Sequence, residues 1–578
     1  MRFLLLTLFL LLALPAGAQE RVLADGESLD GWTAVTPEGV SLRLSLDEGR
    51  TGRAIRLDYD FNGHGGYAIA RRELDLTLPE NYRFRWWLRA EGPDGALPPV
   101  QDLEFKLVDP SGQSVWWHNR RRFEYPARWA RLATRARHMS FAWGPASGAA
   151  PGRLGSLEFV VTAATGGRGT VWIDDVTYEA LPPEGPYTGT PVATANVNEA
   201  DATHVLDGDP ATTWTASSGT PRLTLDFGLS REFGALTLDW GAHAAADYDV
   251  ELSDDGQTWT TARRIRDGNG GRDRLYMPET EARYLRLHFL RGREGYELAE
   301  VGVEPVAFSA TPNEWLQNVA GQAPRGRYPR SLLRSGTFWT VIGADRDEAE
   351  ALVGEDGEVE VGSRRFTLEP FLYTGGRLLS WADSDTTTQA LAHHTLPLPS
   401  ITRRHGGLAL ETTAFVAGDS GRAVLYVRYR VEGNDEPVRL LLAARPWGVN
   451  PPYQWLNVSG GWAPVRDVRV DGGALVIDGR PVVPLGPVAA MGAASSGMGD
   501  VSDWLATGTV PPAQAAFDSL GFAGGALAFD VAPGEDVWVA VPMDGSTERP
   551  AGGLPADEVA QVGQGVLAAT EARWIQRL

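Results

Sequence analysis

The chain has 578 residues, a net charge of −21, 20 tryptophans and no cysteine. Its length exceeds what a single hydrophobic core organises, and its acidic balance argues against nucleic acid or an anionic membrane as a partner, since both select basic surfaces. The lack of cysteine excludes disulfides and cysteine-linked lipid anchors, so the fold must rely on its cores and on bound ions.

Residues 1–18 have the pattern of a secretory signal peptide. Arg2 precedes a mostly apolar run from Phe3 to Leu14, and Ala16-Gly17-Ala18 predicts cleavage before Gln19. The run is too short to span a membrane with these flanks, and no later stretch is long and apolar enough. We therefore expect no transmembrane segment, and a location in the periplasm or outside the cell.

Residues 19–185 are predicted to form a first β-sandwich domain. Apolar and polar residues alternate with a period of two over short runs, at 54–59, 82–88, 103–108, 157–161 and 170–176. Asp30-Gly31-Trp32 and the closing run 169–178 resemble jelly-roll carbohydrate-binding modules. In such modules an aspartate of the last strand often joins N-terminal oxygens around Ca²⁺, and the resemblance implies that Asp174 or Asp175 has this role.

Aromatic residues are in surplus in this first domain. Sugar rings stack their C–H faces on flat aromatic rings, while neighbouring polar groups bind the hydroxyls. Alternation along a strand puts adjacent tryptophans on opposite faces, so one of each pair can be core and the other exposed, and the alternative for each ring is an ordinary core tryptophan. The candidate sugar-binding residues are Trp86, Trp87, Trp116, Trp117, His118 and Trp129, and Trp143 belongs to the same surplus.

Residues 186–306 are organised around the stretch 204–214. Asp207 and Asp209 stand two residues apart on a Gly-Asp-Pro turn, and Thr212 follows three residues later. Such a turn can direct several oxygens to one centre, as Ca²⁺ requires. The alternative is an aspartate-rich loop that satisfies only its own backbone.

Five motifs in order extend this observation, namely 204–214, 223–228, 247–259, 282–287 and 296–301. They resemble the discoidin family, also called coagulation factor 5/8 type C domains, which includes several bacterial carbohydrate-binding modules. The resemblance implies a structural Ca²⁺ held by Asp207, Asp209 and Thr212 with the carbonyl of His204. Glu300 and the carbonyl of Ala299 would close the site.

A predicted linker at 307–330 precedes longer β-runs at 331–550. The run 445–466 resembles the β-supersandwich that precedes the (α/α)6 barrel in glucoamylase-type and debranching-type glycosidases. Residues 551–578 form one helical pattern, at the position of the helix that leads into such a barrel. The resemblance implies a helical-barrel catalytic domain or subunit as a partner.

The overall expectation is an all-β protein of three tandem sandwiches, a jelly roll, a discoidin-like jelly roll and a large supersandwich, with a short C-terminal helix. We expect a secreted carbohydrate-binding protein whose partner is a polysaccharide or oligosaccharide, with structural Ca²⁺ and no catalytic residue assigned. One alternative is a six-hairpin glycoside hydrolase truncated before its catalytic barrel. Another is a cell-surface adhesion protein, because both domain types also bind proteins and lipids.

Overall fold

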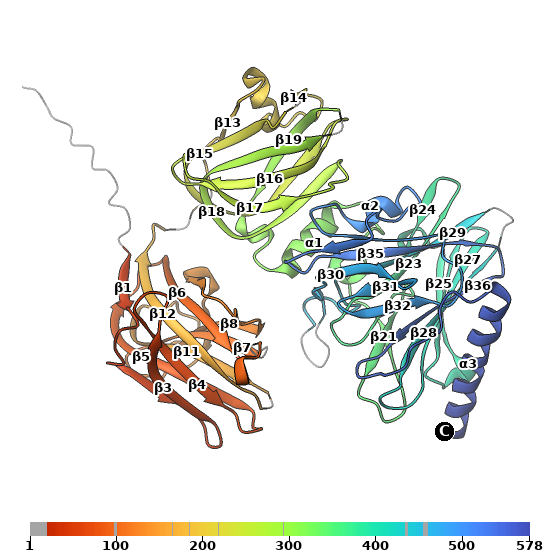
Figure 1. The fold of residues 1–578 in the computed structure, drawn as a ribbon, viewed down its shortest axis with the longest axis horizontal. Coiled ribbons are helices and arrows are strands. Elements are labelled where there is room, and N and C mark those ends of the chain that lie inside the picture. Colours follow the sequence, from red (N-terminus) through yellow and green to blue (C-terminus); the bar gives the residue numbers. More distant parts are fainter. Residues whose placement is uncertain are drawn as a thin grey trace, which may run out of the picture. The chain divides into compact units, whose positions relative to one another are not determined.

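The computed structural model describes residues 20–97, 101–164, 166–183, 185, 187–217, 219–292, 294–433, 437–454 and 460–577, without the side chain of Arg122. The predicted signal peptide lies outside these residues. The chain forms two compact units, Met1–Tyr187 and Thr188–Leu578. Strands dominate both (Figure 1), which confirms the all-β prediction with a C-terminal helix. Among the described residues, no helix combines the length and the apolar character that crossing a membrane requires.

The first unit is a sandwich of two antiparallel six-stranded sheets. The first sheet, called sheet A, has the order β3-β4-β12-β6-β9, with β1 paired to β12: β1 (Arg21–Ala24), β3 (Ser41–Glu48), β4 (Arg53–Asp60), β6 (Tyr82–Glu91), β9 (Ala130–Arg135), β12 (Arg168–Ala180). Sheet B has the order β10-β8-β7-β11-β5-β2: β2 (Trp32–Val35), β5 (Gly66–Thr77), β7 (Gln101–Val108), β8 (Val115–Phe123), β10 (Ser140–Trp143), β11 (Arg153–Ala163). Short 3-10 turns η1 (Pro93–Gly95) and η2 (Ala136–His138) connect strands.

The core of the first unit follows from the period-two pattern. Phe84 and Trp86 of β6 and Phe105 of β7 are all at most 1% exposed. The rings of Trp86 and Phe105 stack with centroids 4.9 Å apart. The intervening polar residues face away from the core, so each sheet presents one polar face.

The second unit begins with seven strands in the order β14-β19-β15-β18-β16-β17, with β13 paired to β15. They are β13 (Val192–Ala195), β14 (Trp214–Ala216), β15 (Arg222–Trp240), β16 (Ala245–Ser253), β17 (Thr260–Ile265), β18 (Arg272–Gly292) and β19 (Tyr296–Glu304). The long strands β15 and β18 contain register shifts. A 3-10 turn, η3 (Glu199–Leu206), leads directly into the loop that carries Asp207.

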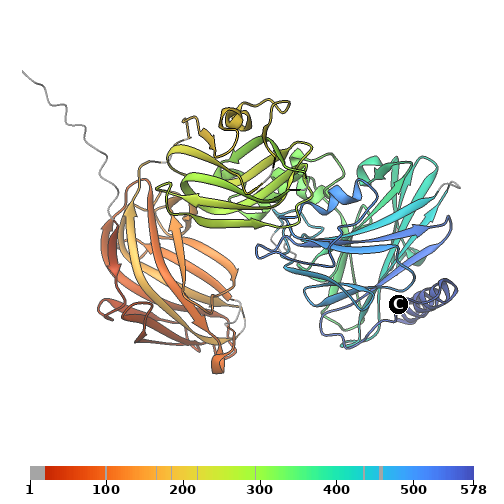
Figure 2. The same ribbon diagram turned by 45° about the horizontal axis from the view of Figure 1, so that its top comes forward.

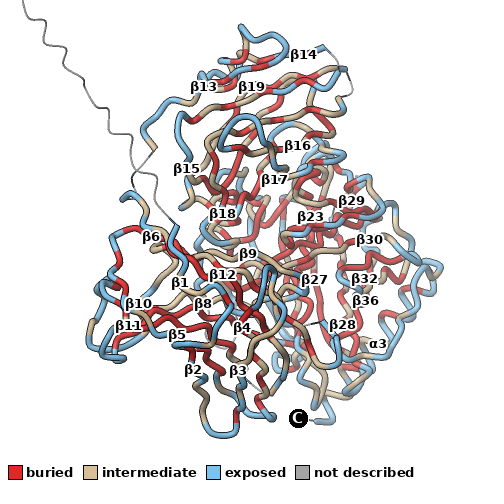
Figure 3. Tube along the Cα trace, turned by 60° about the vertical axis from the view of Figure 1, so that its left-hand side comes forward, coloured by how far each residue is buried: buried red, intermediate tan, exposed pale blue. Residues whose placement is uncertain are grey.

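The rest of this unit is a large sandwich of an eight-stranded and a nine-stranded sheet. The first contains β20 (Trp339–Gly343), β21 (Glu350–Gly354), β22 (Val359–Glu360), β23 (Thr367–Thr374), β24 (Arg377–Leu379), β29 (Val438–Arg445), β33 (Ala490–Ala494) and β35 (Gly524–Val531). The second contains β25 (Thr386–Leu391), β26 (Pro399–His405), β27 (Leu408–Ala417), β28 (Val424–Glu432), β30 (Asp467–Asp471), β31 (Ala474–Ile477), β32 (Arg480–Pro484), β34 (Ala515–Phe517) and β36 (Asp536–Pro542). Figure 3 shows buried residues concentrated along the strands and exposed residues at the turns.

In the described part of the chain, three α-helices flank the large sandwich: α1 (Pro312–Gln322), α2 (Val501–Leu505) and α3 (Ala556–Arg577). Helices α1 and α2 lie on the side of the seven-stranded domain, and α3 lies on another side (Figures 1 and 2). A side chain at Gly563 would overlap the indole of Trp538, so α3 packs directly on this ring. The remaining 3-10 turns are η4 (Val306–Phe308), η5 (Arg330–Leu333), η6 (Trp381–Asp383) and η7 (Ala392–His394).

The segment 307–330, predicted as a linker, contains the helix α1. Its Trp315 and Leu316 are buried in one cluster with Tyr276 of β18 and with Trp447 and Phe522 of the large sandwich. The N–H of Asn269 also donates to the carbonyl of Met498 at 2.9 Å. The seven-stranded domain and the large sandwich therefore share a hydrophobic core within the second unit.

Asp273 gives this unit a pH-dependent stability. Its Oδ2 accepts the Nε1–H of Trp240 at 2.8 Å and the hydroxyl of Tyr248 at 2.6 Å, and burial raises the pKa of Asp273 to about 6. A raised folded-state pKa favours the protonated form, so its stabilisation is lost as the pH rises from about 4 through about 6. Relative to Asp273→Asn, which keeps the acceptor, the native chain should lose up to about 3 kcal/mol over this range, at about 1.4 kcal/mol per pKa unit. Urea unfolding at several pH values measures the difference, and parallel stability curves for the two proteins would contradict it.

Candidate functional site

The structure separates the paired tryptophans of the first unit as strand alternation requires. Trp86 is 0% exposed in the core, and Trp116 is 4% exposed with its Nε1–H donated to the carbonyl of Ala149 at 2.6 Å. Neither of these two rings offers a free face to a ligand. Trp87 and Trp117 lie on the opposite faces of their strands and are only partly buried.

Arginine side chains cover the aromatic rings on the polar face of sheet A. The guanidinium of Arg50 lies 4.5 Å from the ring centroid of Trp87, and that of Arg89 lies 5.5 Å from the centroid of Trp129. Arg89 also lies 4.1 Å from the ring of Trp172. A sugar would have to displace these cations before it could stack on the rings.

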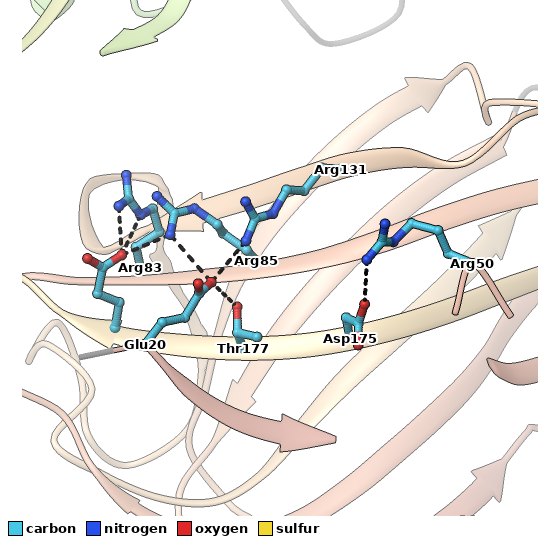
Figure 4. A network of polar contacts seen from close by, with 8 residues as sticks. Glu20, Arg50, Arg83, Arg85, Arg131, Asp175 and Thr177 are labelled. Carbon is cyan, nitrogen blue, oxygen red and sulfur yellow. Dashed lines mark hydrogen bonds and ion pairs between the residues drawn. The ribbon is translucent and has the colours of Figure 1, made fainter. Parts of the chain in front are cut away.

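Other polar side chains of sheet A also form ion pairs and hydrogen bonds with one another. Arg83 and Arg85 of β6 both contact Glu179, at 2.6 and 2.9 Å, and Glu20 accepts the hydroxyl of Thr177 at 2.6 Å. Figure 4 shows Arg131 and Arg85 directed to Glu20 at one end of the network and Arg50 directed to Asp175 at the other. This face is therefore occupied by its own ion pairs.

The polar face of sheet B has a different arrangement. Trp117 of β8 and Trp143 of β10 meet edge to face, with ring centroids 5.8 Å apart. The ammonium of Lys106 on β7 lies 5.7 Å from the centroid of Trp117 and 5.1 Å from that of Trp143. Trp143 remains 47% exposed. This pair of rings can support the apolar face of a ligand.

Hydrogen-bonding groups lie beside these two rings. Lys106 Nζ contacts Glu104 Oε2 at 2.8 Å, and Asn119 donates to Glu104 Oε1 at 3.3 Å. We call Glu104, Lys106, Trp117, Asn119 and Trp143 together the Trp117–Trp143 face. Lys106 and Glu104 were not among the predicted residues. The signal that could have identified them is the pair of charges alternating with apolar residues in the run 103–108.

His118 is held between the sheets and not on this face. Its Nδ1 lies 3.0 Å from the hydroxyl of Thr134, and its ring packs against His138 with centroids 4.7 Å apart. Burial, with the positive charge of Arg120 second, lowers the pKa of His118 to about 2. The imidazole is therefore neutral at ordinary pH, and its contacts are internal.

The loop after η3 brings most of the predicted metal ligands of the second unit together. Asp207 Oδ2 accepts the hydroxyl of Thr212 at 2.8 Å, and Asp207 Oδ1 accepts the N–H of Asp209 at 2.9 Å. Asp209 Oδ1 accepts a hydrogen bond from the N–H of Ala211 at 3.0 Å. The His204 carbonyl accepts the N–H of Asp207 at 3.4 Å. The loop thus satisfies much of its own backbone, as the alternative interpretation expects.

Glu300 of β19 adds the observation that fits a cation. Among the residues that the structure describes, its buried Oε1 has no hydrogen-bond partner, and Ala299 beside it is buried. Burial raises the pKa of Glu300, and the nearby carboxylate of Asp207 raises it further. Within the described part of the chain, no group of three or more His, Cys, Asp or Glu residues suits a metal. Hydroxyl and backbone oxygens would have to complete the ligand set here, which Ca²⁺ accepts.

The structure distinguishes between Asp174 and Asp175. Asp174 is 1% exposed, and its Oδ2 accepts the N–H of Arg50 at 2.9 Å. A side chain at Gly26 or Gly49 would come within 2.8 Å of this carboxylate, so the two glycines leave a cradle around it. Asp175 has a left-handed φ of 47° and pairs with Arg50 at 3.2 Å (Figure 4). Only Asp174 thus lies among the N-terminal backbone groups that the predicted site requires.

Comparison with known proteins identifies one domain. Residues 192–301 match the family model of the F5/8 type C domain. The chain therefore contains a discoidin domain, and its resemblance to that family is confirmed. No curated protein matches the chain.

Several solved structures that resemble parts of the chain are carbohydrate-binding modules. Chitosan-binding module 1 of a chitosanase/glucanase from Paenibacillus sp. IK-5 is 26% identical over 21% of this chain and 98% of its own, with a TM-score of 0.19. The family 11 carbohydrate-binding module of a cellulosomal cellulase of Clostridium thermocellum is 15% identical over 29% of this chain and 99% of its own, with a TM-score of 0.24. The module CpGH89CBM32-5 of Clostridium perfringens, in complex with GalNAc-β-1,3-galactose, is 23% identical over 20% of this chain and 94% of its own, with a TM-score of 0.18.

We expect chelation of calcium to lower the melting temperature of the native chain. An ion that binds only the folded state stabilises it by mass action, by about 2.7 kcal/mol at a hundredfold excess over its Kd. Asp207→Ala should abolish the part of this response that arises in the second unit. Calorimetry with and without EDTA measures both effects.

The matched control is Asp255→Ala. Asp255 caps a turn of the same domain by accepting the N–H groups of Gln257 and Thr258. This variant should keep the full response to EDTA. If native protein and Asp207→Ala respond to EDTA equally in the second unit, the loop holds no calcium.

Proposed function

We propose that the protein is a secreted, multi-modular carbohydrate-binding protein. The observation that carries the proposal is the Trp117–Trp143 face, where a half-exposed indole lies beside a carboxylate, an ammonium and an amide. Aromatic rings bind the C–H face of a sugar, and the polar groups select its hydroxyls. The F5/8 type C match at 192–301 supports the same function, because this family includes carbohydrate-binding modules.

The binding step divides between two kinds of contact. The sugar ring lies against Trp143, and the partly exposed Asn119 forms hydrogen bonds with its hydroxyls. Glu104 and Lys106, each 6% exposed, form an ion pair that holds the two rings in place. Since Lys106 is neutralised by Glu104, the face carries little net charge and suits a neutral glycan. A single site of this kind binds weakly, and linked modules increase the effective concentration at a polymeric ligand.

Calcium has a structural role in this proposal. The carboxylates of Asp207 and Glu300, with Thr212 and backbone carbonyls, would hold one ion in the discoidin domain. Asp174 would hold another in the first unit. A bound ion supplies positive charge that relieves the repulsion between the carboxylates of Asp207 and Glu300 and keeps the loops rigid.

The large sandwich is proposed to be an accessory domain. Its position before α3 suits docking to a helical-barrel catalytic domain or subunit, as in glucoamylase-type glycosidases. The carboxylates of Asp383 and Asp385, which lie near Trp381, accept hydrogen bonds from nearby backbone N–H groups. Asp383 Oδ2 accepts the N–H of Ser380 at 2.9 Å, and Asp385 accepts the N–H of Gly406 at 2.6 Å. These contacts favour a structural over a catalytic role for the two carboxylates.

Affinity electrophoresis in gels that contain soluble polysaccharides tests the proposal, with chitosan and mixed-linkage β-glucan among the polymers. We expect at least one polymer to retard the native chain. Trp143→Ala and Trp117→Ala should each weaken binding by roughly tenfold or more, as truncating an aromatic anchor does. Binding should occur without turnover of the polymer.

Trp87→Ala is the matched control, because its ring lies on the other sheet beneath Arg50. It should leave retardation unchanged. If Trp87→Ala abolishes binding and the other two variants do not, sheet A is the binding surface. If the protein binds cells and no competing sugar displaces it, adhesion through proteins or lipids replaces the proposed function.

A further inference from the structure

A hollow in the second unit lies between the segment that follows α1 and the hairpin of β23 and β24. It has a volume of about 220 Å³. A cavity needs only about 10–15 Å³ to hold a water molecule, so this one has room for a group of several heavy atoms. Its lining includes three arginines, one aspartate and one serine, namely Arg325, Arg327, Arg377, Asp383 and Ser380.

Two stretches that are distant in the sequence lie against each other at this hollow. Gly326 has a left-handed φ of 90°, and a side chain at this position would overlap the hydroxyl of Ser380. The hydroxyl of Ser380 in turn donates to Asp383 Oδ2 at 2.8 Å. Because the backbone at Gly326 lies directly on Ser380, the arginines on either side of the glycine line the same hollow as Arg377.

The positive charge around the hollow exceeds the negative charge that balances it. Arg377 lies 3.7 Å from Asp383 Oδ1, beyond hydrogen-bonding distance, and its side chain is 74% exposed. Asp383 Oδ2 is already occupied by the N–H and the hydroxyl of Ser380. Three guanidinium groups thus line the hollow with one carboxylate, in a chain where 74 acidic residues outnumber 53 basic ones.

Arg325 has the largest unused bonding capacity of the three arginines. Within the described part of the chain, its guanidinium forms no hydrogen bond and no ion pair, and it lies 5.4 Å from the ring centroid of Trp381. Arg330 lies 4.2 Å from the same centroid but is paired with Asp356 at 2.6 Å. The ring therefore positions Arg325 without using its N–H groups, which are available to a ligand.

Arg327 is held more firmly at the wall of the hollow. One of its terminal N–H groups donates to the carbonyl of Ser502, and its own main-chain carbonyl accepts a hydrogen bond from Arg445 at 2.7 Å. Its charge also acts on the carboxylate of Asp503. Arg327 thus supplies a fixed positive charge, while Arg325 and Arg377 supply the unused donors.

We propose that this hollow binds an ester group with three terminal oxygens, a phosphate or a sulfate monoester. A carboxylate has only two oxygens and would be matched by a single guanidinium fork, whereas three arginines suit a larger oxyanion. A phosphate monoester carries a charge of about −1.5 to −2 at pH 7, which matches the excess of positive charge that three arginines and one aspartate leave. The site is separate from the Trp117–Trp143 face and does not depend on it.

Isothermal titration calorimetry on the full chain at low ionic strength tests this site with D-glucose 6-phosphate and D-glucose 6-sulfate. Sodium phosphate and sodium sulfate are comparison probes, because a free ion presents the same oxygens as an ester borne by a sugar. D-Glucose and sodium acetate are the others. We expect at least one ester to bind roughly tenfold or more tightly than glucose and acetate.

The comparison probes define the ligand. Equal binding of free phosphate or sulfate would overturn the assignment to an ester and leave a free ion as the ligand. Equal binding of acetate would overturn the assignment to a group with three terminal oxygens. Equal binding of glucose would show that the arginines have no part in recognition, and would overturn the proposal as a whole.

Variants locate the ligand. Arg325→Gln and Arg377→Gln should each weaken ester binding by roughly fivefold or more, and the double variant should weaken it further. Both arginines are exposed, so the variants should fold, which their melting temperatures verify. Arg365→Gln is the matched control, because Arg365 is an exposed arginine of the same sandwich that pairs with Asp544 at 3.0 Å. Native affinity in the folded double variant, or an equal loss in Arg365→Gln, would refute the proposal.

The double variant Trp117→Ala/Trp143→Ala separates this inference from the proposed function. It should lose polysaccharide retardation and retain ester binding. If it loses ester binding instead, the ester occupies the Trp117–Trp143 face, and the hollow has no such role. If the native chain binds the ester but no polysaccharide, the hollow stands and the proposed glycan-binding face fails.

Discussion

The buried pair of Arg445 and Glu369 is the interaction on which the second unit depends most. Arg445 is 1% exposed and donates to both oxygens of Glu369, at 2.9 and 2.6 Å, and to the carbonyl of Arg327 at 2.7 Å. Trp447 donates to the same carboxylate at 2.8 Å. Removing either charge alone would leave its partner buried and unpaired, a loss of about 3–5 kcal/mol. The pair joins β23, β29 and the segment after α1, so it holds in place the wall against which the discoidin domain packs.

Rigid sheets place functional groups on the faces that the cores do not use. Glu104 and Lys106 stand two residues apart on β7, and Phe105 between them points into the core. Because Phe105 is locked by its stack on Trp86, the two charged side chains are held in position on the opposite face. Packing and recognition are therefore coupled along a single strand. Sites built on such elements keep their geometry better than sites built on loops.

Residue alternation and short motifs in the sequence were sufficient to predict some features of the fold and the site, but not others. Alternation predicted the sandwiches and the opposed tryptophans, and ordered motifs predicted the discoidin domain. The choice of Asp174 over Asp175 depends on one left-handed residue and two glycines distant in the chain. The meeting of Trp117, Trp143 and Lys106 depends on strand pairing between β7, β8 and β10. Three prolines suggested a linker at 307–330, so the helix α1 was not predicted. The apolar face of α1 is evident only in the folded structure, where it packs against Tyr276 and Phe522.

Charge neutralisation explains why the two sheets of the first unit differ as binding surfaces. On sheet A, Arg50 covers Trp87 while it pairs with Asp175, and Arg56 lies over Trp172 while it pairs with Asp47 and Asp58. Each cation is thus fixed over a ring by its carboxylate, and a sugar would have to break both contacts. On sheet B a single ammonium serves two rings and leaves Trp143 half exposed. The lower cost of access favours sheet B, although the polar face of sheet A also carries aromatic rings.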